Sequence, residues 1–258
     1  MSKLPHIGCW CLATLLYFFP APLSAGCLVS DAVPGAQGRF TVHLDGACTP
    51  AEREAHAVDA STLLTALERG ETVDLNGVLI RGDVVLDTLP VVTAPPALDG
   101  ILGPQEKEVR VIAGAVSIVN SIVQGRIVHR SPDGTLVFSG PVTFTGTTFQ
   151  QMLDLSRAVF TQAVLLSGAV FLAEGYFVQG RFLREVTGEK MAFGRHTRFH
   201  RSRFEGPVTF EQSGFSGLGE FLEVRFDRDA NFARTYFKLR TGFSGAQFSG
   251  LADSSEAL

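Results

Sequence analysis

Few residues of this chain have types and spacings that could support catalysis or metal binding. His196 and His200 are four residues apart, a spacing that would present two metal ligands on one face of a helix. Asp83 and Asp87 share that spacing, but turn chemistry explains two aspartates beside a corner more simply than a catalytic carboxylate pair does. The chain has no glycine-rich phosphate loop, no Gly-x-Ser-x-Gly motif and no Cys or His cluster with metal-ligand spacing. The sequence therefore predicts no catalytic residue, no metal site and no cofactor.

Three arginines stand out because of their regular spacing. Arg181, Arg203 and Arg225 are 22 residues apart, and each directly precedes a phenylalanine. If residues at this interval stack on neighbouring strands, the three guanidinium groups form one outward column, with about 5 Å between rungs. This Arg column needs compensation, because like charges opposite each other on adjacent strands destabilise a sheet.

Two kinds of partner could compensate the Arg column. Nearby carboxylates could pair with it, since surface ion pairs are common; the candidates are Glu205, Glu223 and Asp227. Alternatively, the column could bind an anionic ligand such as phosphate, a lipopolysaccharide head group or an acidic glycan, because arginine suits bidentate anion binding. Both interpretations stay open at this point.

The first 26 residues have the features of an export signal. Lys3 supplies a positive start, Cys9 to Phe19 is an apolar run, and Pro20 to Gly26 ends in small residues. The apolar run is shorter than the roughly 20 residues that a membrane-spanning helix needs. We therefore expect the signal to be cleaved and the mature chain to be exported to the periplasm or the outside of the cell; an uncleaved anchor is the alternative.

Cys27 and Cys48 are the two cysteines that follow this signal. In an oxidising compartment, two thiols favour one disulfide. A different interpretation comes from residues 23–27, Leu-Ser-Ala-Gly-Cys, which resemble a bacterial lipobox and would attach a lipid, and so a membrane tether, to Cys27. Ser24 departs from that motif, which has a bulky aliphatic residue at this place, and lipidation would leave Cys48 unpaired.

The elements that carry these residues are defined by a repeat of phenylalanine. One series recurs every 11 residues without a gap: Phe138, Phe149, Phe160, Phe171, Phe182, Phe193, Phe204, Phe215, Phe226, Phe237 and Phe248. A second series follows six residues later in each unit: Phe144, Leu155, Leu166, Phe177, Gly188, Phe199, Phe210, Phe221, Phe232 and Phe243. The residue two places before each large side chain is mostly small, and positions two apart share one face of an extended strand. The spacings of 5 and 6 exclude an amphipathic helix, whose apolar face recurs at 3, 4 and 7.

Each unit is therefore a very short strand with one small and one large inward side chain, followed by a corner. Such a strand must stack on identical strands above and below, which predicts a solenoid with ladders of phenylalanine inside. Gly188 interrupts the second series, so Val186, Met191 or a local bulge must fill the gap. The two histidines fall in a strand and a corner of this repeat, and they need not converge on a metal ion.

Several segments make the chain similar to a known family. Residues 73–77 and 78–82, Val-Asp-Leu-Asn-Gly and Val-Leu-Ile-Arg-Gly, resemble pentapeptide repeats of the Ala-Asp/Asn-Leu-x-x kind. Residues 230–234 and 244–248 resemble the Phe-rich, eleven-residue branch of the pentapeptide-repeat family. The resemblance covers about residues 71–250, and it implies an all-β fold, a right-handed quadrilateral parallel β-helix with four short units per coil.

We expect five parts along the chain: a signal peptide (1–26), an N-terminal segment with capping helices (27–70), an irregular first part of the solenoid (71–137), a regular Phe-ladder solenoid (138–250) and a C-terminal tail (251–258). Residues 49–52 have the form of a capped helix start, and Asp59 or Ser61 could cap a second helix. Residues 90–108 and 130–134 are rich in proline or turn residues, so we expect them to leave the solenoid as two excursions.

These features favour a non-enzymatic role. The formal net charge of −4 does not indicate a nucleic-acid partner. Uniform repeats argue against the polysaccharide lyases that some parallel β-helices form, because those enzymes need a cleft of clustered acidic and basic residues. We expect a structural or protein-interaction module of the bacterial cell envelope with an unidentified partner, since solenoids bind through their broad faces; the alternative is an anion binder that uses the Arg column. The resemblance also implies a homodimer, because members of the family often pair through the C-terminal end of the solenoid.

Overall fold

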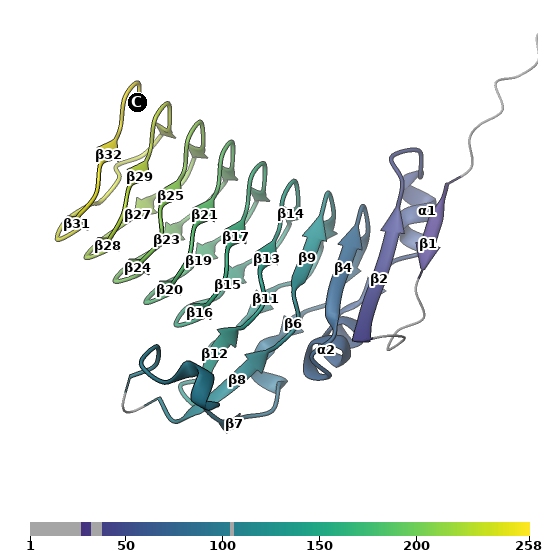
Figure 1. Ribbon diagram of the computed structural model, residues 1–258. Helices are drawn as coiled ribbons and strands as arrows, with labels where there is room; N and C mark the ends of the chain where they lie inside the picture. The colour runs from purple at the N-terminus through teal and green to yellow at the C-terminus, as the bar shows by residue number, and fades with distance from the viewer. Residues whose placement is uncertain (1–26, 32–37, 104–105) are drawn as a thin grey trace, which may run out of the picture.

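The structure, a computed structural model, describes residues 27–31, 38–103 and 106–258. The export signal expected in residues 1–26 lies outside the described residues. The described chain is nearly all β, and its short strands wind into a parallel β-solenoid whose coils stack side by side (Figure 1). Four sheets form the sides of this solenoid, so the predicted four-sided parallel β-helix is confirmed.

The four sheets are called A to D here, and their strands follow in spatial order. Sheet A consists of β1 (Val29–Asp31), β2 (Arg39–Leu44), β4 (Thr72–Asn76), β9 (Val116–Val119), β13 (Val142–Thr143), β17 (Val164–Leu165), β21 (Val186–Thr187), β25 (Val208–Thr209), β29 (Ala230–Asn231) and β32 (Ala252–Asp253). Sheet B consists of β3 (Val58–Asp59), β5 (Leu79–Arg81), β10 (Ile122–Val123), β14 (Thr148–Phe149), β18 (Val170–Phe171), β22 (Ala192–Phe193), β26 (Gly214–Phe215) and β30 (Tyr236–Phe237). Sheet C consists of β6 (Val84–Val85), β11 (Ile127–Val128), β15 (Leu153–Asp154), β19 (Gly175–Tyr176), β23 (Thr197–Arg198) and β27 (Gly219–Glu220). Sheet D consists of β7 (Val92–Thr93), β8 (Glu108–Ile112), β12 (Thr135–Phe138), β16 (Val159–Phe160), β20 (Arg181–Phe182), β24 (Arg203–Phe204), β28 (Arg225–Phe226) and β31 (Gln247–Phe248).

The register of the regular coils is 22 residues, as the repeat predicts. Val142 pairs with Val164 in sheet A and Phe160 with Phe182 in sheet D. All pairings between coils are parallel, whereas β1 pairs with β2 and β7 with β8 in antiparallel fashion within the described chain. The last eight residues, expected to be a tail, include β32, which extends sheet A.

The phenylalanines stack in columns inside the solenoid. In sheet D the rings from Phe138 to Phe248 follow one another with centroid separations of 4.7–5.3 Å and nearly parallel planes. In sheet B the rings from Phe149 to Phe237 do the same at 4.5–5.0 Å. These distances match the spacing of adjacent strands, so each ring lies against the ring one coil away. The two predicted main ladders are therefore present, and they form part of the core of the rod.

The small inward positions carry buried hydroxyl groups as well as alanines. Thr147 donates to the carbonyl oxygen of Ile118 at 2.7 Å, and Thr235 donates to that of Phe210 at 2.9 Å. Ser213 makes the same contact with Gly188 at 3.0 Å. Each hydroxyl thus finds an acceptor in the preceding coil, which removes the cost of burying it among phenylalanine rings.

Met191 fills the gap that Gly188 leaves in the second series. Its side chain is buried, and a Cβ atom placed on Gly188 would lie 2.3 Å from the Met191 Cε. Of the three options that the sequence left open, the structure therefore shows the second: Met191, at a position where most units have a small residue, fills the gap. The volume missing at one inward position is supplied by its neighbour in the same coil.

We expect this exchange of volume to show as strong coupling in a double-mutant cycle. Met191→Ala should cost about 2–5 kcal/mol through the cavity that it leaves. Gly188→Phe should lower the free energy of unfolding by about 1–3 kcal/mol, because the ring would overlap the Met191 side chain. The double variant should be more stable than the sum of these two losses predicts, by at least 1 kcal/mol, since the new ring would enter the space vacated by methionine. Urea unfolding measures all three; additive losses would contradict this account.

Left-handed backbone recurs once in every eleven-residue unit. The positive φ values, between 55° and 71°, fall at Gly146, Arg157, Gly168, Gln179, Lys190, Arg201, Gln212, Glu223, Arg234, Gly245 and Glu256. They lie at two of the four corners of each coil. Non-glycine residues here accept a conformation that costs roughly 1–2 kcal/mol, because the strands on either side leave the corner no alternative.

Two helices and an antiparallel strand cover the N-terminal end of the rod. Helix α1 (Pro50–Ala55) starts with the expected capping box, in which the Thr49 side chain accepts from Glu52 N and the Glu52 carboxylate accepts from Thr49 N at 2.7 Å. Helix α2 (Ala60–Glu68) follows Asp59 and buries Leu63 and Leu67 in the core. The small helical cap predicted from sequence is thus confirmed.

The first excursion folds back over the outer face of sheet D. It runs from the 3-10 turn η2 (Leu86–Thr88) through β7 and the second turn η3 (Pro96–Leu98) to β8 (Figure 1). Leu98 packs there against Val137 and Val159, which would otherwise be exposed. The outer face of sheet D is therefore apolar and covered near the excursion, and it carries arginines from β20 onward.

Candidate functional site

The structure places the three arginines of the Arg column next to one another on the outer face of sheet D. Arg181 pairs with Arg203, and Arg203 with Arg225, in the ladders β20–β24–β28. The parallel register thus juxtaposes three like charges on consecutive rungs.

Carboxylates one coil further along compensate two of these arginines. Arg181 forms an ion pair with Glu205 at 2.9 Å, and Arg203 forms one with Asp227 at 2.7 Å. The hydrogen bond that Arg203 Nε donates to the Asp227 carboxylate raises the pKa of Arg203 above its usual value. Arg225 makes no ion pair within the described part of the chain. Glu223, the third expected partner, instead pairs with Arg201 at 2.9 Å, whose hydrogen bond lowers the pKa of Glu223.

Arg181 has a second contact, with the first excursion. Its Nη1 donates to the carbonyl oxygen of Ile101, which belongs to the loop that covers sheet D. The first member of the Arg column therefore also fastens this loop, a role that its sequence position did not indicate.

Cys27 and Cys48 are joined by a disulfide. With Asp45 they form the only group in the described ranges whose His, Cys and carboxylate ligand atoms are clustered closely enough for a metal ion, but both sulfur atoms are committed to the disulfide. His196 is exposed, and His200 lies 3.7 Å from a Glu223 oxygen. The histidine pair shows no shared ligand geometry.

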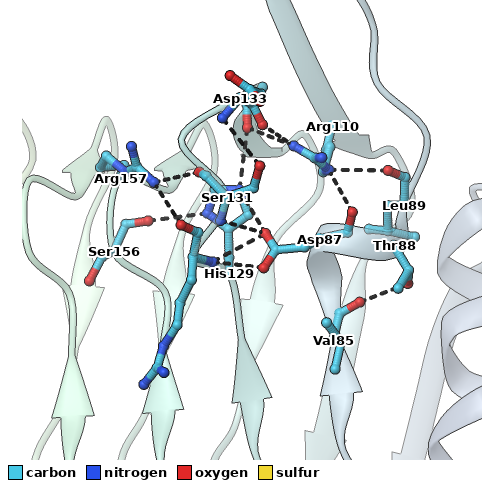
Figure 2. Close-up of polar contacts among 12 residues, drawn as sticks. Val85, Asp87, Thr88, Leu89, Arg110, His129, Ser131, Asp133, Ser156 and Arg157 are labelled. Atoms are coloured by element: carbon cyan, nitrogen blue, oxygen red, sulfur yellow. Dashed lines mark hydrogen bonds and ion pairs between the residues drawn. The ribbon is translucent and has the colours of Figure 1, made fainter.

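Both excursions leave the solenoid at the same corner in consecutive coils. The first separates β6 from β8, and the second separates β11 from β12, so each interrupts the passage from sheet C to sheet D. The carboxylate of Asp87 in the first excursion accepts hydrogen bonds from the backbone N–H groups of Arg130 and Ser131 in the second, at 3.0 and 2.9 Å (Figure 2). Asp83 directly precedes β6. Its carboxylate accepts a hydrogen bond from Arg126 Nη2 at 2.6 Å, and this bond lowers the pKa of Asp83. The two aspartates thus have the structural role expected of turn residues.

Arg110 connects the two excursions from the inside. Its side chain is buried, and its Nε donates to the carbonyl oxygens of Asp87 at 3.2 Å and Leu89 at 3.1 Å. Its Nη1 donates to the carbonyl oxygens of Asp133 and Gly134 in the second excursion (Figure 2). Every acceptor is a backbone carbonyl, so Arg110 fixes the shape of both loops at once.

His129 lies beneath the second excursion and is almost fully buried. Its Nε2 is 3.3 Å from the Gly134 carbonyl oxygen, and its Nδ1 is 3.3 Å from that of Ser156. The Nη2 of Arg157 donates to the carbonyl oxygens of Ser131 and Arg130 from the next coil. The second excursion is therefore held from both sides by polar side chains.

We expect Arg110→Met to destabilise the protein by about 2–3 kcal/mol, because it leaves the buried Leu89 carbonyl and the partly buried carbonyls of Asp87 and Asp133 without this donor. Arg126→Met is the matched control, since Arg126 is half-exposed and its main partner is a surface carboxylate. Loss of a surface pair of this kind should change the stability much less, because solvent screens the interaction. Thermal unfolding followed by circular dichroism distinguishes the two, and equal losses would mean that Arg110 is not the connection described.

A groove of about 770 Å³ lies where the excursions meet the coils. Residues 106–108 of the first excursion and 131–135 of the second contribute to its lining. The coils contribute Arg157, Gln179, Arg181 and Arg201. This excursion groove is a concave site on the outer surface of the described chain, lined by both excursions and by three consecutive coils.

Sequence reasoning identified both excursions but not the groove between them. The signal was present, because each excursion interrupts the repeat at the same phase, after the strand of sheet C. Arg157 and Gln179 were missed because their positions carry no motif; with Arg201 they share only an interval of 22 residues.

No helix among the residues that the structure describes combines the length and apolar character needed to cross a membrane. Comparison with known proteins adds no identity: no protein-family model, no curated protein and no solved structure matches the chain.

Proposed function

We propose that this chain is a non-enzymatic structural or protein-interaction solenoid of the bacterial cell envelope, and a member of the Phe-rich branch of the pentapeptide-repeat family. The observation that carries the proposal is the constant register of 22 residues from β12 onward, with phenylalanine columns inside and sheets outside. A core of this kind produces a rigid rod whose outer surfaces are free to vary, which is how solenoids present binding surfaces.

Site-specific photo-crosslinking in the native envelope tests an interaction role. One crosslinking residue is placed on each face, at Thr209 in sheet A, Ala192 in sheet B, Arg198 in sheet C and Arg225 in sheet D. A partner-binding rod should yield a discrete crosslinked species from one or two faces and none from the others. Absence of a discrete species from all four faces would contradict the interaction role.

We further propose that the chain is exported and that Cys27 is the first or nearly the first residue of the mature protein. The disulfide between Cys27 and Cys48 supports this, because such bonds persist in oxidising compartments. The unreduced intact mass tests it: a mass that starts near Cys27 and lacks two thiol hydrogens is expected. An added diacylglyceryl group on Cys27 would indicate the membrane-tethered lipoprotein instead, and retention of residues 1–26 would indicate an uncleaved anchor.

A homodimer through the C-terminal coil is a separate proposal. Leu251 and Leu258 are 72% and 82% exposed there, Phe248 is 41% exposed, and Phe243 is only partly buried. Because the N-terminal end is covered by α2 and β1, an isologous contact between two C-terminal ends would bury these side chains without forming an open filament. Light scattering across a hundredfold concentration range tests it, and a monomer mass throughout would exclude it.

Binding of an anionic ligand through Arg181, Arg203 and Arg225 is the less favoured alternative. Glu205 and Asp227 already compensate the first two of these arginines. The alternative now depends on Arg225, so Arg225→Gln should abolish any affinity of the wild-type column for inorganic phosphate.

A further inference from the structure

The excursion groove gathers cationic groups that retain free hydrogen-bond donors. Arg157 uses only its Nη2 for the second excursion, and Arg201 uses its Nε and Nη2 for Glu223. The remaining Nη1 groups of both arginines have no hydrogen-bond partner among the described residues. Arg181 and Lys107 add two further positive charges to the lining. The groove can therefore donate several hydrogen bonds to anionic groups without losing its internal contacts.

The spacing of these groups is set by the coils. Arg157, Gln179 and Arg201 occupy the same left-handed corner position in three consecutive coils, with φ values of 60°, 57° and 56°. Neighbouring strands lie about 4.8 Å apart, so Arg157 and Arg201 are separated by roughly 10 Å along the rod. Gln179 stands between them.

The excursions contribute acidic groups to the same groove. Glu106 accepts from Thr135 at 3.0 Å, whereas the carboxylates of Glu108 and Asp133 have no hydrogen-bond partner within the described part of the chain. These carboxylates would repel a simple anion such as phosphate. A neutral sugar would leave the guanidinium groups without an anionic partner. A ligand that satisfies both sets needs anionic groups for the arginines and hydroxyl donors for the carboxylates.

We propose that the excursion groove binds a short acidic saccharide, whose anionic groups contact Arg157 and Arg201 and whose hydroxyl groups donate to Glu108 and Asp133. The walls are prepared for this, because Arg110 and Asp87 hold both excursions in place before any ligand arrives. This inference goes beyond the proposed function, since an interaction rod needs no saccharide site, and the crosslinking result does not depend on it.

Gln179 offers a clean test because its side chain makes no hydrogen bond among the described residues. Gln179→Glu adds a negative charge between Arg157 and Arg201, and Gln179→Arg adds a positive one. Gln212 is the matched control: it is also an exposed glutamine with left-handed backbone, but it lies at the opposite corner of its coil and outside the groove. Circular dichroism melts establish that all variants fold alike.

Titration calorimetry on the full mature chain uses four probes: trigalacturonate, glucose 1,6-bisphosphate, maltotriose and inorganic phosphate. We expect one or both acidic sugars to bind at millimolar concentration or tighter, and maltotriose and phosphate to bind at least tenfold more weakly. The uronate and the sugar phosphate distinguish carboxylate from phosphate as the anionic group. Gln179→Glu should weaken the acidic sugar at least about fivefold, since one unit charge at close range contributes about 1 kcal/mol even in water. Gln179→Arg should strengthen it, and Gln212→Glu should change it less than twofold.

Three results would overturn the proposal. Failure of both acidic sugars to bind excludes the ligand class. Phosphate binding as tight as that of the acidic sugars reduces the groove to a simple anion site. Equal effects of Gln179→Glu and Gln212→Glu place any binding outside the groove.

Discussion

Phe204→Ala should lower the free energy of unfolding by about 3–5 kcal/mol, the range for removing a fully buried phenylalanine. Phe204 is 0% exposed, and its ring stacks between Phe182 at 4.7 Å and Phe226 at 5.3 Å. Truncation therefore leaves a cavity in the middle of a column and removes two ring contacts at once. Because each coil is stabilised mainly by its neighbours, the loss should also weaken the coils on either side.

Phe248→Ala is the control for this prediction. Phe248 belongs to the same column but is 41% exposed and has one stacked neighbour, Phe226 at 4.7 Å. Its truncation should cost less than about 1.5 kcal/mol, because less apolar surface is lost from the interior. Urea unfolding and hydrogen exchange of β20, β24 and β28 measure both variants. Similar losses at the two positions would show that the columns do not carry the stability of the rod.

Removal of the disulfide by Cys27→Ser/Cys48→Ser should cost about 3 kcal/mol, because the bond closes a chain segment of 21 residues and restricts the unfolded state. The effect should be concentrated at the N-terminal end. The disulfide connects the start of β1 to the chain just after β2, and β1 covers the edge of sheet A at this end. We therefore expect faster hydrogen exchange in β1 and β2 and a lower melting temperature.

A reductant provides the control for the disulfide prediction. Wild-type protein in dithiothreitol should approach the melting temperature of the double serine variant, while the variant should not respond. Unchanged exchange of β1 and β2 in the variant would mean that the N-terminal strands are held by their hydrogen bonds alone.

The interior of the rod could be predicted from the sequence because each coil repeats the same pattern of small and large inward side chains. Phe160 and Phe182 occupy equivalent positions 22 residues apart, so their stacking follows from the period alone. The capping box at Thr49 was equally predictable, since it involves residues only three positions apart. Both features follow from residue types at fixed intervals, which can be read directly in the sequence.

The outer contacts of the Arg column required the structure. Glu205, Glu223 and Asp227 were all reasonable partners for the column by proximity in sequence, yet Glu223 pairs with Arg201 instead. Which carboxylate meets which arginine depends on rotamers and on the neighbouring coil, and the repeat period does not specify either. The same holds for Met191, one of three possible ways to fill the rung at Gly188.

By itself the sequence determined the solenoid, its coil length, its phenylalanine columns and the places where the chain leaves the coils. Only the tertiary structure decided that the two excursions meet, that Arg110 and Asp87 connect them, and that Arg157 and Arg201 line the groove beside them. The physical reason is the range of the interactions. A periodic core is specified by side chains that stack on the equivalent side chains one coil away. The groove instead forms between segments of different sequence, and their contacts depend on the positions that the folded coils give them.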